Sequence, residues 1–207
     1  MGWQDYKVSD VPEGESGDWR VSRITVTQQE EDFMRLRAVI NHQREDRTVK
    51  AGEYTQLTRN GAIIMSDTPA EIRDHMMPIR MASGHCLVNG LGLGVVANGM
   101  LMRDNVTLVT VIEQSEDVAK LVGPHYQAKW GDRFELIVAD AFEWKAPRGS
   151  RYDCAWHDIW DTISEDNLET MTKLKRRYGR RAGWQGCWQE KGCRAQKRRV
   201  ATGQGWY

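Results

Sequence analysis

The chain has 207 residues, and its 29 Lys+Arg balance its 29 Asp+Glu, so no net field recruits nucleic acid or a membrane surface. The length fits one domain with a short N-terminal extension. No apolar run approaches the roughly 20 residues of a membrane span. Residues 1–20 are polar and acidic and lack a signal-peptide pattern, so we expect a cytoplasmic protein.

The cysteine pattern argues against disulfides and metals. Cys86, Cys154, Cys187 and Cys193 lack CxxC spacing, and two of them fall inside apolar segments with strand character. We therefore expect free, buried thiols in a reducing compartment and no metal site.

The N-terminal part predicts a strand followed by a helix. Residues 19–26 alternate apolar and polar side chains, as a half-buried strand does. Thr27 and Glu30 form a capping-box pattern that starts a helix. The apolar face of that helix is formed by Phe33, Leu36, Val39 and Ile40.

A β-hairpin and a second helix follow. Residues 54–66 contain two short apolar segments around Asn60-Gly61, a pair that tolerates the positive φ angles of a tight hairpin turn. Thr68 and Pro69 then provide a helix cap and a first-turn proline. Pro78 is expected to end or kink that helix.

The central stretch is residues 85–102, HCLVNGLGLGVVANGMLM. It predicts a buried strand, a turn with Gly90, Gly92 and Gly94, and an apolar helix. Glycines at that spacing let the chain reverse and let backbone N–H groups face a ligand, beside the positive end of a helix. The alternative is a glycine-rich connection without a ligand.

Three further strands end in acidic residues or lead directly to them. Residues 106–112 end at Glu113, residues 134–139 end at Asp140, and residues 152–157 precede Asp158. Ser115 begins a helix that we expect to close at Gly123-Pro124. Residues 166–177 predict another helix, and residues 182–188 a short fifth strand.

This alternation predicts an α/β fold: a Rossmann-like parallel sheet with flanking helices, preceded by a small N-terminal region with a β-hairpin and helix. The sequence leaves open whether the sheet is shortened. We expect an N-terminal extension over residues 1–82, a ligand-binding domain over residues 83–194 and a flexible tail over residues 195–207.

In such sheets the ligand lies at the carboxyl ends of the strands. Glu113 is placed to accept hydrogen bonds from both hydroxyls of a ribose, although an acid there also favours the dipole of the next helix. Asp140 could accept from an adenine amino group, with Ala141 leaving room for the ring, or it could be a turn aspartate. NAD is a competing ligand, but Val95 stands where a third dinucleotide-binding glycine would be.

The segments LVNGLGLG, TVIEQS, LIVADAFEW and YDCAWHDIWD resemble motifs I to IV of class I S-adenosylmethionine-dependent methyltransferases. The spermidine synthase branch is the more similar one, because residues 57–78 resemble its hairpin and helix, and residues 152–161 resemble its YDxxxxDxxD motif. The resemblance covers roughly residues 52–163. It implies S-adenosylmethionine as cofactor and S-adenosylhomocysteine as product.

The resemblance also implies roles for individual residues. Asp158 would lie near the sulfonium and the acceptor, and Asp161 would be the base. The implied cofactor-binding residues, together with their neighbours at the strand ends, are Gln56, Asn89, Gly90, Gly92, Gly94, Glu113, Gln114, Asp140, Ala141 and Asp158.

Two other residues have both a functional and a structural interpretation. The ring face of Trp160 could stabilise a sulfonium cation, or Trp160 could simply pack in the core. His157 is suited to be a general base near neutral pH, or it is a buried, hydrogen-bonded histidine at the end of a strand.

Residues 173–199 are strongly basic, with Glu190 their only acid, and contain Tyr178, Trp184 and Trp188. This mixture suits weak nucleic-acid contact, or a solvated helix end. An edge strand at residues 182–188 could form a homodimer seam.

The sequence therefore predicts a methyltransferase with an unidentified small-molecule or macromolecular acceptor. The alternatives are a spermidine synthase-like aminopropyltransferase and a non-catalytic binding or assembly protein on the same fold. We expect no membrane partner.

Overall fold

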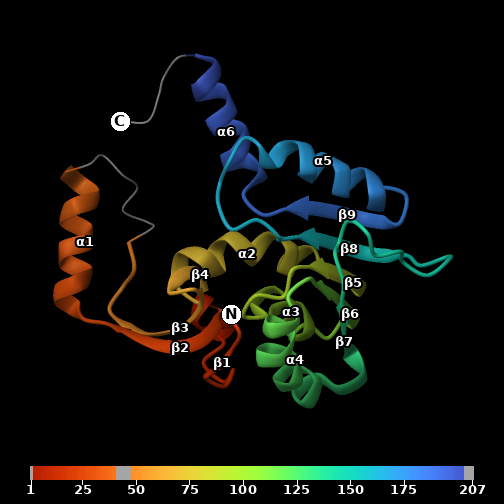
Figure 1. Ribbon diagram of the computed structural model, residues 1–207, viewed down its shortest axis with the longest axis horizontal. Helices are drawn as coiled ribbons and strands as arrows, with labels where there is room; N and C mark the ends of the chain where they lie inside the picture. The colour runs from red at the N-terminus through yellow and green to blue at the C-terminus, as the bar shows by residue number, and fades with distance from the viewer. Residues whose placement is uncertain (1, 41–47, 203–207) are drawn as a thin grey trace.

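The computed structural model describes residues 2–40 and 48–202 and contains two sheets (Figure 1). The smaller sheet is antiparallel in the order β1-β2-β3-β4: Gly14–Ser16, Trp19–Val26, Gly52–Arg59 and Ala62–Ser66. The larger sheet is parallel in the order β7-β6-β5-β8-β9. Its strands in chain order are β5 Gly84–Asn89, β6 Val106–Glu113, β7 Phe134–Val138, β8 Tyr152–His157 and β9 Ala182–Cys187.

Helices α2 to α5 cover the two faces of the parallel sheet. In chain order, the helices of the described residues are α1 Gln28–Ile40, α2 Pro69–Met81, α3 Val95–Leu101, α4 Glu116–Trp130, α5 Asn167–Tyr178 and α6 Glu190–Ala201, with short 3₁₀ turns η1 Trp3–Tyr6 and η3 Gly131–Arg133. Helices α2, α3 and α4 share one hydrophobic cluster with Val88 and Val109. Helix α5 packs against Leu87 and Ala155 on the opposite face. The apolar strands are buried between these two layers, as parallel sheets require.

The strand order defines where a ligand can bind. The chain runs outward from the central β5 through β6 to β7, then returns to β8 on the other side of β5. The direction of winding reverses between β5 and β8, and open α/β sheets bind ligands beyond the carboxyl ends of strands at such a point. The expected Rossmann-like α/β fold is therefore confirmed.

The small sheet shares the core of the large one. Val21 of β2 and Leu57 of β3 belong to the same buried cluster as Val88 of β5. The fully buried Asp67 accepts hydrogen bonds from the backbone N–H groups of Val8 and Thr55, at 3.0 and 2.7 Å. Strands β2 and β3 thus pack directly against the parallel sheet and position the hairpin of β3 and β4 beside it.

Local patterns predicted several features correctly. Thr27 and Glu30 form the expected capping box, because the Glu30 N–H donates to Thr27 Oγ1 and Glu30 Oε2 accepts from the Thr27 N–H. The Asn60-Gly61 turn has φ values of +50° and +79° and joins β3 to β4. The four cysteines are free and buried.

Helices α1, α2 and α4 form where the sequence predicts them, and one predicted helix end was wrong. The predicted apolar face of α1 is exposed. Helix α2 continues past Pro78 to Met81, so Pro78 does not end it. Helix α4 continues past Gly123 and Pro124 to Trp130, because Val122 and Tyr126 extend one buried apolar stripe across the glycine and proline.

The C-terminal region also differs from its prediction. Residues 195–201, expected in a flexible tail, continue helix α6. Helix-favouring Lys, Arg, Ala and Gln dominate this segment. The buried Cys193 and the 3.0 Å ion pair between Glu190 and Lys175 of α5 tie its first turns to the protein. Every helix in the described part of the chain is too short or too polar to cross a lipid bilayer.

Candidate functional site

The glycine turn between β5 and α3 is fixed by its neighbours. Gly90 has φ +95° and Gly94 has φ +78°. A Cβ on Gly90 would collide with the carbonyl oxygen of Asp158, and a Cβ on Gly94 would collide with the ring of Tyr126. The Gly90 N–H donates to the Ile112 carbonyl at 2.8 Å. The turn is therefore held between the ends of β6 and β8 and admits only glycine at these positions.

Glu113 joins the glycine turn to the end of β6. Its side chain is 9% exposed, and its Oε2 accepts from the Leu91 N–H while its Oε1 accepts from the Ser115 N–H, both at 2.7 Å. A carboxylate has about four acceptor positions, so two remain for a ligand. The pair of contacts fixes the carboxylate without using all of its hydrogen-bonding capacity.

Asp140 lies at the neighbouring strand end. The backbone connection is direct, because the Ala139 N–H donates to the Glu113 carbonyl at 2.9 Å. Asp140 Oδ1 accepts from the Phe142 N–H at 2.7 Å, which makes a tight turn. Ala141 is 4% exposed beneath it. The structure thus brings Gly90–Gly94, Glu113 and Asp140 to one edge of the sheet.

Met65 of β4 covers part of the glycine turn. The Leu93 N–H donates to Met65 Sδ at 3.3 Å, and a Cβ on Gly92 would lie 2.6 Å from the same sulfur. A thioether is a weak acceptor, so this contact is readily exchanged for a stronger one. The hairpin therefore contributes the roof of the candidate site through Met65.

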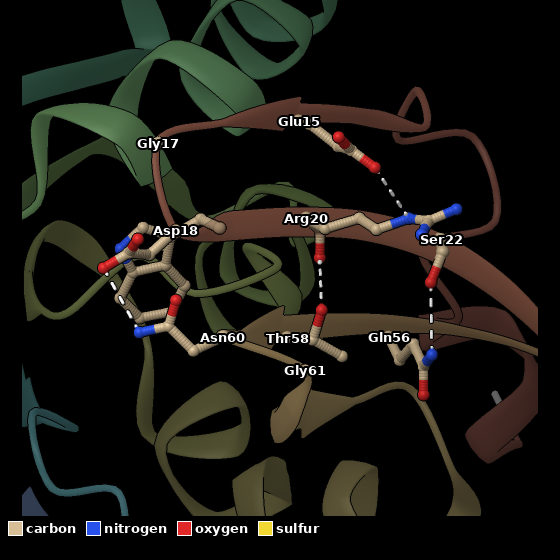
Figure 2. Close-up of a pocket in the computed structure, with 10 residues that line it drawn as sticks. Glu15, Gly17, Asp18, Arg20, Ser22, Gln56, Thr58, Asn60 and Gly61 are labelled. Atoms are coloured by element: carbon tan, nitrogen blue, oxygen red, sulfur yellow. Dashed lines mark hydrogen bonds and ion pairs between the residues drawn. The ribbon is translucent and has the colours of Figure 1, made fainter.

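Gln56, expected to reach the cofactor from the hairpin, lies elsewhere. Strand alternation places Leu57 in the shared core and Gln56 on the other face of β3. Gln56 Nε2 donates to Ser22 Oγ at 3.1 Å (Figure 2). Both side chains line a polar groove of about 410 Å³ on the small sheet, together with Glu15, Asp18, Arg20 and Asn60. The glycine turn does not line this groove.

Asp158 follows β8 and lies beside His75 of α2. The distance from Asp158 Oδ2 to His75 Nδ1 is 3.5 Å, and the two side chains are 19% and 3% exposed. Burial raises the pKa of Asp158 to about 7, against a lowering effect of the Trp156 indole. Three other carboxylates raise the same pKa: Glu71, Asp74 and Asp161. Asp158 can therefore take up and release a proton near neutral pH.

His75 responds in the opposite direction. Burial lowers the pKa of His75 to about 4, so its imidazole is neutral at pH 7. Its Nδ1 and the Nε1 of Trp156 are both buried without a well-formed hydrogen bond within residues 2–40 and 48–202. Buried polar atoms without partners are rare and mark candidate functional positions.

Asp161 and Trp160 lie in the segment that follows β8. Asp161 is exposed, and it acts on Asp158 through its charge. Trp160 Nε1 donates to Thr170 Oγ1 of α5 at 3.0 Å, and its ring packs in the clusters under that helix. The observed contacts of Trp160 are those of a packing residue.

His157 lies on the opposite side of β8 from Trp156, fully buried. Its Nδ1 is 2.7 Å from Asn89 Nδ2, its Nε2 is 3.4 Å from Gln185 Oε1, and burial lowers its pKa to about 4. The Asn89 side chain is thus directed to His157 rather than to the glycine turn. Gln114 is exposed at the end of β6. The structure does not bring these three side chains together with Asp158.

Sequence reasoning did not identify His75. The signal was present, because Ile72, His75 and Ile79 follow helical spacing and are all buried. A histidine within an apolar stripe needs a partner across the interface. That partner is about eighty residues away in the chain, so spacing alone did not indicate Asp158.

The basic stretch is partly engaged within the protein. Lys175 and Arg194 both pair with Glu190, at 3.0 and 2.8 Å. Arg177 and Arg181 donate to the backbone carbonyls of Trp144 and Pro147. The two arginine bonds attach the end of α5 and the turn after it to the loop after β7.

No protein-family model matches the sequence, and no curated relative was found. Solved structures similar to the chain are mostly methyltransferases, with a spermidine synthase among them. The spermidine synthase of Thermotoga maritima has a TM-score of 0.45 and 14% identity, with 79% of this chain and 52% of that chain covered. The CcbJ methyltransferase of Streptomyces caelestis has a TM-score of 0.40 and 17% identity, covering 50% and 43%.

A third similar structure is the protein arginine methyltransferase 10 of Arabidopsis thaliana, with a TM-score of 0.42, 13% identity, and 52% and 32% coverage. The chain thus spans between a third and about half of the length of these three proteins. At these identities the similarity concerns the fold, and it assigns no acceptor.

Proposed function

We propose that the protein binds S-adenosylmethionine over the glycine turn and transfers its methyl group to an acceptor beside Asp158. One observation carries the proposal: the glycine turn, Glu113 and Asp140 converge at one sheet edge, next to the partly buried carboxylate of Asp158, whose pKa is raised to about 7. The glycine turn, Glu113 and Asp140 match the parts of an adenosyl group. The carboxylate of Asp158 can accept a proton from a nucleophile.

The residues present fit the cofactor. Glu113 retains acceptor positions for the two ribose hydroxyls after binding two backbone amides. Asp140 uses Oδ1 on Phe142, and the small side chain of the neighbouring Ala141 suits the approach of a flat base. When bound, the cofactor supplies an activated methyl group on a sulfonium.

The protein's own contribution is alignment and proton handling. The rigid turn fixes the donor, so the acceptor needs only to be held in line with the bond that breaks. Asp158 accepts the acceptor's proton, and the neutral imidazole of His75 adds no positive charge beside it. The nearby Glu71, Asp74 and Asp161 favour an acceptor that carries or develops positive charge.

Calorimetric titration with S-adenosylmethionine and S-adenosylhomocysteine tests the proposal. We expect one site per chain for both ligands, and loss of both in Glu113→Ala. The matched control is Glu116→Ala, since Glu116 is an exposed acid of α4 that pairs with Lys120. Absence of binding to the parent protein, or unchanged binding in Glu113→Ala, contradicts the proposal.

Product analysis separates the two transfer reactions on this fold. Incubation with decarboxylated S-adenosylmethionine and putrescine should give no spermidine if methyl transfer is the activity. Cofactor binding without turnover of any acceptor would instead support a binding or assembly protein.

A further inference from the structure

Helix α1 presents an apolar face that nothing in the described chain covers. Phe33, Leu36, Val39 and Ile40 are 60%, 58%, 55% and 65% exposed. They are four of the ten large hydrophobic side chains that are exposed in the described residues, and they fall within eight positions. Contiguous exposed apolar patches of this kind are uncommon on monomers and mark interaction sites.

The opposite side of α1 is attached to the protein. Ala38 is 5% exposed, and Glu31 Oε2 accepts from the Ala51 N–H at 2.7 Å. In Figure 1, α1 stands at the edge of the molecule beside the small sheet, away from helices α2 to α6. One side of α1 thus contacts the rest of the protein, and the other side is exposed.

The charges around the apolar face indicate which partner fits it. Phe33, Leu36 and Ile40 follow the spacing i, i+3, i+7 and form one stripe. At 3.6 residues per turn, Glu30 and Arg37 fall on the same flank of that stripe, toward opposite ends of the helix. In antiparallel packing the same flanks of the two helices meet, so a second α1 packed antiparallel sets each Glu30 against the other Arg37.

The apolar side chains obey the same symmetry. In the antiparallel arrangement Phe33 meets Leu36 of the partner subunit, and Leu36 meets the partner's Phe33. Such reciprocal contacts define a two-fold interface. We propose that α1 is a self-association surface, through which two copies of this chain pair antiparallel.

The size of the α1 surface determines how strongly we expect two copies of the chain to associate. Stable interfaces bury about 1,600 Å² in total, and one helix pair buries less. We therefore expect a weak, concentration-dependent dimer with a dissociation constant in the micromolar range. This inference does not depend on the proposed methyl transfer.

Sedimentation velocity from about 1 µM to about 200 µM tests the inference. The parent protein should shift from monomer to dimer. Leu36→Glu should weaken the dimer at least a hundredfold, because it places a charge at the centre of the stripe. The matched control is Val200→Glu on α6, since Val200 is 53% exposed and lies outside the surface; it should dimerise as the parent does.

A charge variant tests the antiparallel geometry. Arg37→Glu should weaken the dimer at least tenfold, because Glu30 then faces an acid in each of the two reciprocal contacts. All these side chains are exposed, so circular dichroism should show an unchanged fold. A parent protein that stays monomeric throughout, or a dimer that Leu36→Glu leaves intact, overturns the proposal. A dimer unaffected by Arg37→Glu overturns the antiparallel arrangement.

Discussion

The two halves of the candidate site differ in how their polar groups are satisfied. In the cofactor half, Glu113 and Asp140 hold backbone amides at 2.7 Å and are fixed by the strand ends that carry them. In the acceptor half, Asp158 and His75 lie 3.5 Å apart, and Nδ1 of His75 has no well-formed hydrogen bond in the described chain. The first half is organised before a ligand binds, while the second keeps unmet polar groups at a cost in stability.

The largest expected effect is on the organised half. Gly94→Val would combine a φ of +78° with a collision against the Tyr126 ring. We expect a loss of about 3–5 kcal/mol in unfolding free energy, from backbone strain plus overpacking. Urea denaturation measures it. Gly61→Ala is the matched control, because Gly61 has φ +79° with open space around it, and should cost only about 1 kcal/mol. Equal losses would show that the Tyr126 contact has no role.

The second largest effect is a loss of ligand affinity in a variant that should still fold. Glu113→Gln keeps the size of the side chain but removes the charge and turns one acceptor into a donor facing an amide. We expect S-adenosylmethionine to bind about 100-fold more weakly, since hydrogen bonds to a charged group are worth about 1.5–3 kcal/mol each. Calorimetry gives the affinity. An unchanged affinity would mean that the ribose does not contact Glu113.

The acceptor half of the site should make the free energy of unfolding depend on pH. The pKa of Asp158 is raised to about 7 in the folded chain, so the folded state binds an extra proton between about pH 4 and 7. The stability that Asp158 contributes is full below pH 4 and is lost as pH rises toward 7. Asp158→Asn, which cannot ionise, should therefore gain stability over the parent by at most about 1.4 kcal/mol per pH unit in that window.

Urea midpoints of both proteins at pH 5 and pH 8 measure this gain. The pKa of His75, lowered to about 4, gives a contribution of opposite sign that is present above pH 6.5 and is lost as pH falls toward 4. Because His75 is in both proteins, its contribution largely cancels in their difference. A difference that does not vary with pH would contradict the raised pKa.

The smallest effect concerns the roof of the site. Met65→Ala removes the sulfur that accepts the Leu93 N–H and lies against Gly92. We expect S-adenosylmethionine to bind about two- to fivefold more tightly, because a weak contact no longer has to be displaced. Weaker binding in a titration would show instead that Met65 contacts the ligand.

The sequence predicted that the turn glycines, Glu113 and Asp140 lie at one sheet edge, because the signals for that placement are local. The turn glycines, Glu113 and Asp140 follow apolar strands directly, and parallel strand ends share an edge. The same reasoning failed for Gln56, whose face on β3 depends on Leu57 entering a core shared with the parallel sheet. Short-range pattern does not determine which face of a hairpin meets another sheet.

The acceptor half and the α1 surface depend on contacts between distant segments. His75 meets Asp158 only after α2 has packed on β8. The stripe that includes Phe33 has the spacing of a buried helix face, yet the described chain offers nothing to bury it. Periodicity indicated an apolar surface correctly but did not distinguish a core from an interface.

A crystal structure of the protein with S-adenosylhomocysteine tests the central claim most directly. The account predicts both ribose hydroxyls within hydrogen-bond distance of the Glu113 carboxylate, the adenine beside Asp140, and the sulfur directed toward Asp158. Ligand bound in the polar groove around Gln56 and Ser22, with Glu113 contacting only its own backbone, would contradict it.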